Sequence, residues 1–129
     1  MEPLEIVRLL TQRLNDGDLE GMFELYHEDV VNHPGEHWPE GAPVEGIERF
    51  RETTEEWLGV WESISIETHR VEAHGNRVVA HGAWHTTGRL SGVSGALPVH
   101  LVFTVRDGRI ARVEWFPDHA RADQAARGG

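Results

Sequence analysis

The chain has 129 residues, and we expect one domain over residues 1–129. Its 22 acidic and 12 basic residues give a net charge of −10, which repels phosphate backbones and predicts no nucleic-acid partner. The absence of cysteine excludes disulfides and thiol chemistry, and the absence of lysine excludes Schiff-base chemistry on a side chain. No apolar run approaches the ~18 residues of a membrane span. Because the first residues are acidic where a signal peptide is basic, we expect a cytoplasmic protein without membrane contact.

Two helices and a short strand are expected at the start of the chain. The first helix, over residues 3–14, carries a wide apolar stripe at helical spacing. A turn ends it, and Asp18 can cap a second helix over residues 18–26. Residues 29–32 then form a short strand that places His33 directly before a proline.

A loop, a third helix and four strands are expected in the rest of the chain. Residues 34–45 hold three prolines and two glycines, which predicts a loop over the mouth of a pocket. An amphipathic helix begins near Gly46, and the chain's tail can form a last short helix. The strands pair as hairpins across Gly75-Asn76 and Asp107-Gly108. This order predicts an α+β fold with the helices on one face of an antiparallel sheet.

Three segments carry a family resemblance: NDGDLEGMFELYHEDVVNHP, Val44-Glu45-Gly46 and DGRIARVEWFPD. Residues 4–119 resemble, in the order of their elements, the SnoaL-like, ketosteroid-isomerase-like branch of the nuclear transport factor 2 superfamily. The resemblance implies a cone-shaped, curved antiparallel sheet packed on three main helices, enclosing one apolar pocket. It implies acid/base-catalysed isomerisation, cyclisation, dehydration or epoxide hydrolysis of an apolar or polyketide-like substrate. The alternative is a non-catalytic protein that binds a small ligand with the same fold.

Four residues are candidate catalytic groups under this resemblance. His33 stands where the family carries its acid/base group, and a histidine titrates near neutral pH. Asp118 matches an aspartate that follows the family's closing strand. His81 and His85 share one face of a strand, and we expect that face to point into the pocket. The structural alternatives are a solvated loop position for His33, a helix N-cap for Asp118, and an outward orientation for the two strand histidines.

Aromatic and apolar residues are expected to contact the ligand. Trp57 and Trp61 are one turn apart in the third predicted helix, and the Tyr26 hydroxyl can donate a hydrogen bond or merely close the second helix against the sheet. In ketosteroid isomerases an oxyanion donor stands at the position of Leu101, so leucine there argues against steroid isomerisation by that route. The full set of expected ligand contacts is Tyr26, Trp38, Trp57, Trp61, Leu101, Phe103 and Trp115.

No metal site and no cofactor are expected. His33 and His37 lie in a loop rich in proline and glycine, and His81 and His85 would be about 13 Å apart along an extended strand, too far for one ion. The expected partners are a small apolar molecule and a second copy of the chain. We place the homodimer contact on the outer face of the last two strands, which includes Val102 and Phe116.

Overall fold

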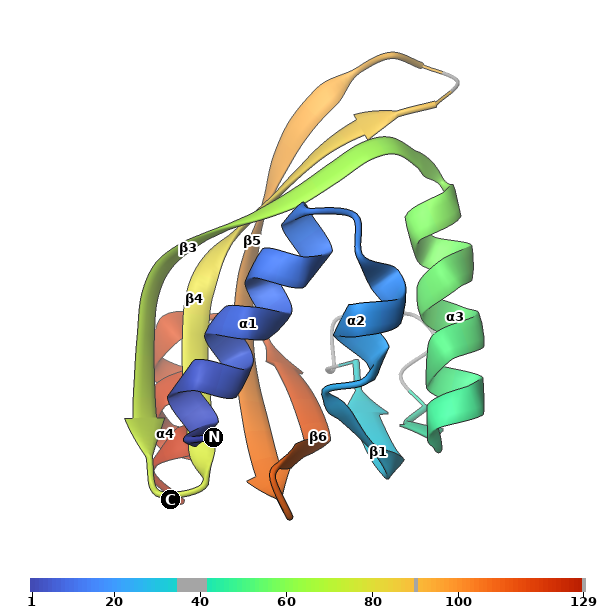
Figure 1. The fold of residues 1–129 in the computed structure, drawn as a ribbon. Helices are drawn as coiled ribbons and strands as arrows, with labels where there is room; N and C mark the ends of the chain where they lie inside the picture. Colours follow the sequence, from blue (N-terminus) through green and yellow to red (C-terminus); the bar gives the residue numbers. More distant parts are fainter. Residues whose placement is uncertain (35–41, 90, 129) are drawn as a thin grey trace.

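A computed structural model describes residues 1–34, 42–89 and 91–128. In it a curved sheet wraps around helices on its inner side (Figure 1). The helices are α1 (Pro3–Asn15), α2 (Leu19–Phe23), α3 (Ile47–Gly59) and α4 (His119–Ala126). The strands are β1 (Tyr26–His33), β2 (Val44–Glu45), β3 (Trp61–His74), β4 (Arg77–Gly88), β5 (Ser94–Arg106) and β6 (Arg109–Phe116).

Within the described residues the sheet has six strands in the order β2-β1-β6-β5-β4-β3. Neighbouring strands are antiparallel except β1 and β6, which pair in parallel. Two neighbouring parallel strands need a long connecting segment. Here the segment that connects β1 to β6 contains most of the chain. The predicted α+β cone is therefore confirmed, with one parallel pair in a sheet that was expected to be antiparallel throughout.

The β5–β6 hairpin turns at the predicted dipeptide. Asp107 and Gly108 both have positive φ angles, 54° and 75°, as a two-residue type I′ turn requires. The two strands that they join then pair from Arg106 opposite Arg109 to His100 opposite Phe116. The Asp107-Gly108 dipeptide was therefore sufficient to predict the β5–β6 hairpin.

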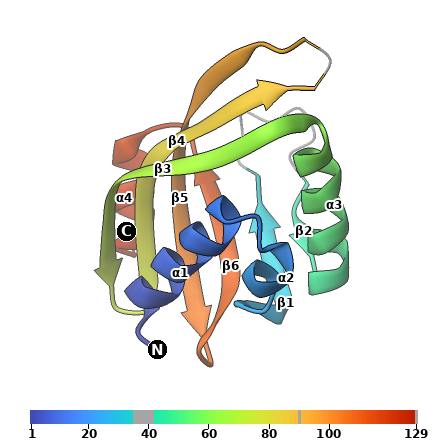
Figure 2. The same cartoon turned by 45° about the horizontal axis from the view of Figure 1, so that its top comes forward.

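The N-terminal helices lie on the concave side of the sheet (Figure 2). Asn15 ends α1 and fastens it to β3, because its side chain accepts a hydrogen bond from Ile66 N (2.8 Å) and donates one to Ile66 O (3.0 Å). Asp18 caps α2 as predicted, accepting from Gly21 N at 3.0 Å. The helix predicted over residues 18–26 is too long, since Tyr26 already pairs with β6 as the first residue of β1.

Helix α4 lies on the opposite, convex face of the sheet, so the expectation of helices on one face only is wrong for this element (Figure 1). Its Ala122 and Ala126 are buried against Val79 and Val102. Phe116 also packs there. The outer surface on which we placed a homodimer contact is thus covered in part by the chain's own helix. No helix in the described ranges is long and apolar enough to cross a membrane.

Candidate functional site

A cavity of about 310 Å³ lies between the concave face of the sheet and α1, α2 and α3. This volume is at the lower end of the range found for small-molecule sites. Apolar residues without an aromatic ring form the largest group in the described wall: Val7, Leu10, Leu14, Met22, Pro34, Ala42, Val44, Leu58, Ile66, Ala80, Leu101 and Val113. The cavity therefore favours a small and largely apolar occupant.

Three tryptophans give the cavity flat walls. Trp57 on α3 meets Trp84 on β4 edge to face, with ring centroids 5.1 Å apart and an interplanar angle of 72°. Trp84 and Trp115 stack at 6.3 Å and 21°. Indole faces pack well against other aromatic rings, so this arrangement suits a flat ring system.

Hydrogen-bond donors stand out among the polar groups of the cavity. Asn32 Oδ1 accepts from Trp115 Nε1 at 2.9 Å, and since an indole can only donate, the Asn32 amide NH₂ is left as a donor. Burial raises the pKa of Tyr26 far above its ordinary value, so its phenol stays protonated. The Trp84 Nε1–H is buried and has no acceptor among the described residues.

No ionisable acid or base other than Tyr26 lines the cavity within the described ranges. Four threonines, Thr11, Thr53, Thr54 and Thr68, add hydroxyl groups, but Thr11 and Thr53 donate to carbonyl groups of their own helices. The cavity is therefore neutral where the structure describes it.

Five of the seven expected ligand contacts line this cavity: Tyr26, Trp57, Leu101, Phe103 and Trp115. Trp61 does not, because α3 ends at Gly59 and Trp61 begins β3, which removes the one-turn relation to Trp57. Trp38 lies outside the described residues, as does His37. Trp84 and Asn32 were missed, although the alternation of inward and outward residues along each strand could have indicated both.

His33 lies one residue beyond the cavity-lining Asn32 and is not part of the cavity wall. Successive strand residues point to opposite faces, so Asn32 takes the inward position that the resemblance assigned to His33. His33 pairs in register with Glu114, and burial followed by the charge of Arg112 lowers the pKa of its imidazole. A catalytic role for His33 stays a prediction.

The strand histidines lie on the convex face, opposite to the expected orientation. Ala80 and Trp84 take the inward positions of β4, which turns His81 and His85 outward. His85 is exposed, with its Nε2 atom 3.6 Å from Glu67 Oε2. His81 is buried beneath α4. The candidate histidines are therefore not brought together at the cavity.

Asp118 is the N-cap of α4, where its Oδ1 atom accepts from Arg121 N at 2.8 Å. We expect Asp118→Ala to lower the free energy of unfolding by about 1 kcal/mol, because the cap is lost. Asp118→Asn should melt like the wild type, because asparagine caps equally well. Urea unfolding of the three proteins measures this. Equal stability of Asp118→Ala and the wild type would show that the cap contributes nothing.

Known structures show the same fold. TerC, co-crystallised with polyporic acid, has 22% sequence identity and a TM-score of 0.77, with 98% of each chain covered. A nuclear transport factor 2-like protein of unknown function from Burkholderia pseudomallei has 18% identity and a TM-score of 0.78, again with 98% of each chain covered. A candidate polyketide cyclase from Pseudomonas putida has 22% identity and a TM-score of 0.74, with 93% of this chain and 94% of that chain covered.

No curated protein matches the sequence. Residues 6–113 match the SnoaL-like domain family. This match spans α1 through most of β6 and so includes nearly every element that forms the cavity. The chain belongs to the SnoaL-like domain family.

Proposed function

We propose that the cavity binds a small, flat, uncharged aromatic or polyketide-like molecule that carries a carbonyl or another hydrogen-bond acceptor. The observation that carries this proposal is the composition of the wall: three tryptophans, aliphatic side chains and neutral donors. Binding of a small ligand was the alternative to catalysis on sequence grounds, and the neutral wall favours it.

The absence of charge on the described wall argues for an uncharged ligand. Burying an ion without a counter-charge is very unfavourable, and no arginine or histidine lines the described wall to pair with an anion. The net charge of −10 adds a long-range repulsion of anions.

The donors argue for an acceptor on the ligand. A buried donor without an acceptor costs about 1–3 kcal/mol, so donors at the cavity wall favour a ligand that accepts from them. Asn32 and Tyr26 offer two such donors. One structural relative is a candidate polyketide cyclase, which agrees with a polyketide-like ligand.

Three naphthalene derivatives test the proposal by isothermal titration calorimetry. We expect 2-acetylnaphthalene, which has a carbonyl acceptor, to bind more tightly than 2-ethylnaphthalene, which has the same shape without the acceptor, by about tenfold. We expect 2-naphthoate, which has a carboxylate, to bind weakest of the three. Tightest binding of the carboxylate would contradict a neutral site, and no binding of any of them would contradict the proposed ligand class.

Asn32→Asp tests most directly whether the Asn32 amide donates a hydrogen bond to the ligand. The new carboxylate still accepts from Trp115 Nε1, but it replaces the donor NH₂ group with an acceptor oxygen. We expect the affinity for 2-acetylnaphthalene to fall by about tenfold or more and that for 2-ethylnaphthalene to change less. Equal losses for both ligands would show that the variant disturbs packing and does not remove a donor.

A second candidate function is cyclisation or isomerisation of the same ligand class. The observation that favours it is the protonated phenol of Tyr26 in an apolar cavity, because such a donor stabilises an enolate-like oxygen more strongly than water does. Asn32 would be the second donor. His33 stays the predicted base, although it follows Asn32 and is not part of the described cavity wall.

Proton exchange tests this second candidate. If the site promotes enolisation, the acetyl protons of 2-acetylnaphthalene should exchange with deuterium oxide faster with the protein than without it, as followed by proton NMR. Tyr26→Phe should lower the protein-dependent rate by about 10²-fold. An unchanged rate in His33→Ala would remove His33 from the reaction, and no protein-dependent exchange would leave ligand binding as the function.

A further inference from the structure

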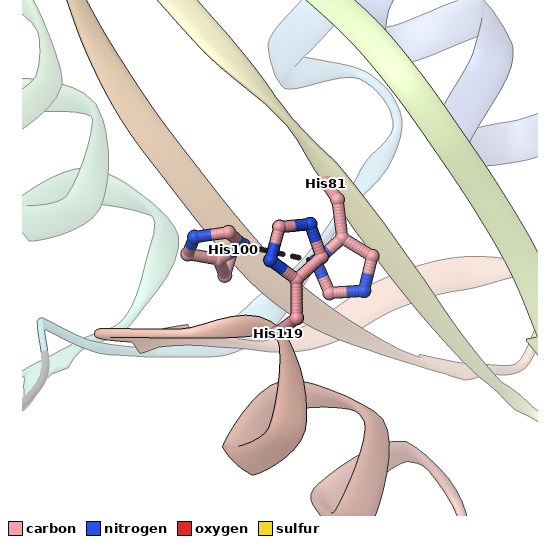
Figure 3. A group of neighbouring side chains, drawn as sticks. All are labelled: His81, His100 and His119. Atoms are coloured by element: carbon pink, nitrogen blue, oxygen red, sulfur yellow. Dashed lines mark hydrogen bonds between the residues drawn. The ribbon is translucent and has the colours of Figure 1, made fainter.

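We propose that His81, His100 and His119 bind a divalent transition-metal cation on the convex face of the sheet, away from the cavity. One ring nitrogen of each residue lies within 4.8 Å of the corresponding nitrogens of the other two. Figure 3 shows the three rings turned toward one another between the sheet and α4.

The tertiary structure brings these histidines together from three elements. His81 on β4 lies directly opposite His100 on β5. His119 is the first residue of α4 and lies over both, with ring centroids 4.3 Å from His81 and 4.4 Å from His100. His81 and His100 are buried, whereas His119 is exposed, so a cation can enter from the side of His119.

Asp123 orients His81 in the way that metal-binding histidines are usually oriented. Its Oδ1 atom lies 2.8 Å from His81 Nε2, and Arg70 Nη2 lies 2.8 Å from both of its carboxylate oxygens. The Asp123 carboxylate is paired with Arg70 and accepts the hydrogen bond from His81 Nε2. His81 Nε2 must then carry the proton, which leaves a lone pair on Nδ1.

The two Nδ1 atoms of His81 and His100 are 2.9 Å apart. Since His81 Nδ1 is the acceptor in a neutral ring, His100 Nδ1 donates in the metal-free protein. On metal binding the His100 proton moves from Nδ1 to Nε2 through solvent, and both Nδ1 lone pairs face the cation without net proton release.

The distances fit a first-row transition metal after a small adjustment. Imidazole is a good ligand for Zn²⁺, Cu²⁺ and Ni²⁺. Zinc–nitrogen bonds of ~2.0–2.1 Å in a tetrahedral site place the ligand nitrogens about 3.3 Å apart. The His81–His100 pair must open slightly, and the exposed ring of His119 must close toward it. A water molecule would take the fourth position on the exposed side.

Zinc titration of tag-free protein tests the site. The protein is dialysed against EDTA and then against chelator-free buffer, and ZnCl₂ is added in a calorimeter. We expect one Zn²⁺ per chain and a rise in melting temperature, because only the folded protein holds the site. Absence of saturable binding at one equivalent overturns the proposal.

Three variants locate the cation. His119→Ala removes an exposed ligand and should weaken Zn²⁺ binding at least tenfold, with an unchanged circular dichroism spectrum. Asp123→Asn should weaken it by about 10- to 100-fold by loosening His81. His85→Ala, an exposed histidine on the same strand, is the matched control and should bind like the wild type.

X-ray absorption of the zinc complex provides an independent measurement. We expect three imidazole ligands and one oxygen ligand around the metal. Fewer than three imidazoles, or equal affinity of His119→Ala and the wild type, overturns the proposal and indicates zinc held elsewhere on the surface. Binding of 2-acetylnaphthalene should be the same in His119→Ala and the wild type, which separates this site from the cavity.

Discussion

Ala80→Phe is expected to abolish ligand binding while the protein stays folded. Ala80 lies on β4 with its side chain in the cavity wall, so a phenylalanine ring there would occupy the space that the ligand needs. Protein interiors tolerate little overlap, and we expect the affinity for 2-acetylnaphthalene to fall by about 100-fold or more. The ring enters existing space, so the melting temperature should be unchanged or slightly higher.

Ala83→Phe is the matched control for this variant. Ala83 lies three residues along the same strand, is half-buried and does not line the cavity. Its substitution adds the same ring to the same strand, and we expect ligand affinity close to that of the wild type. Calorimetry and thermal melting of both variants give the comparison. If Ala80→Phe binds as tightly as the wild type, the ligand does not use this cavity.

Gly82→Ala is expected to have the largest effect on stability. A Cβ atom at Gly82 would overlap the carbonyl oxygen of Glu67 on β3 and would lie 3.2 Å from the Cα atom of Thr68. These are backbone atoms of the neighbouring strand, next to an irregularity in its pairing, and they cannot rotate away. We expect the free energy of unfolding to fall by about 3 kcal/mol and the melting temperature by about 10 °C.

Gly95→Ala is the control for the effect of the methyl group itself. Gly95 lies on the neighbouring strand β5, and a Cβ atom there would meet nothing within 4 Å. Its free energy of unfolding should therefore change little. Chemical unfolding with urea measures both differences. Equal stability of Gly82→Ala and the wild type would contradict the close approach of β3 and β4.

Local signals in the sequence were enough to predict most elements and the fold class. Asp107-Gly108 turns as expected because both positions take positive φ, and Asp18 and Asp118 cap helices as their side chains allow. These features depend on residues close together in the chain. The β1–β6 pair depends on the two ends of the domain meeting, and its parallel direction was not predicted.

The site depended on details that only the tertiary structure decides. Because strand residues alternate between faces, a shift of one position exchanges Asn32 for His33 at the cavity. His81 points away from the cavity for the same reason, and its side chain is then buried beneath α4.

The sequence by itself determined the apolar helices, the hairpin turns and the resemblance to the SnoaL-like proteins, because periodicity, turn chemistry and caps act between near neighbours. The tertiary structure alone decided which residues share a site. His100 is 19 residues from His81 and lies opposite it only through the register of β4 and β5, and His119 joins them because α4 packs on the convex face. The register of the strands and the packing of α4 decide which residues from distant parts of the chain come close. A comparison of histidines within one loop or one strand therefore could not have found this cluster.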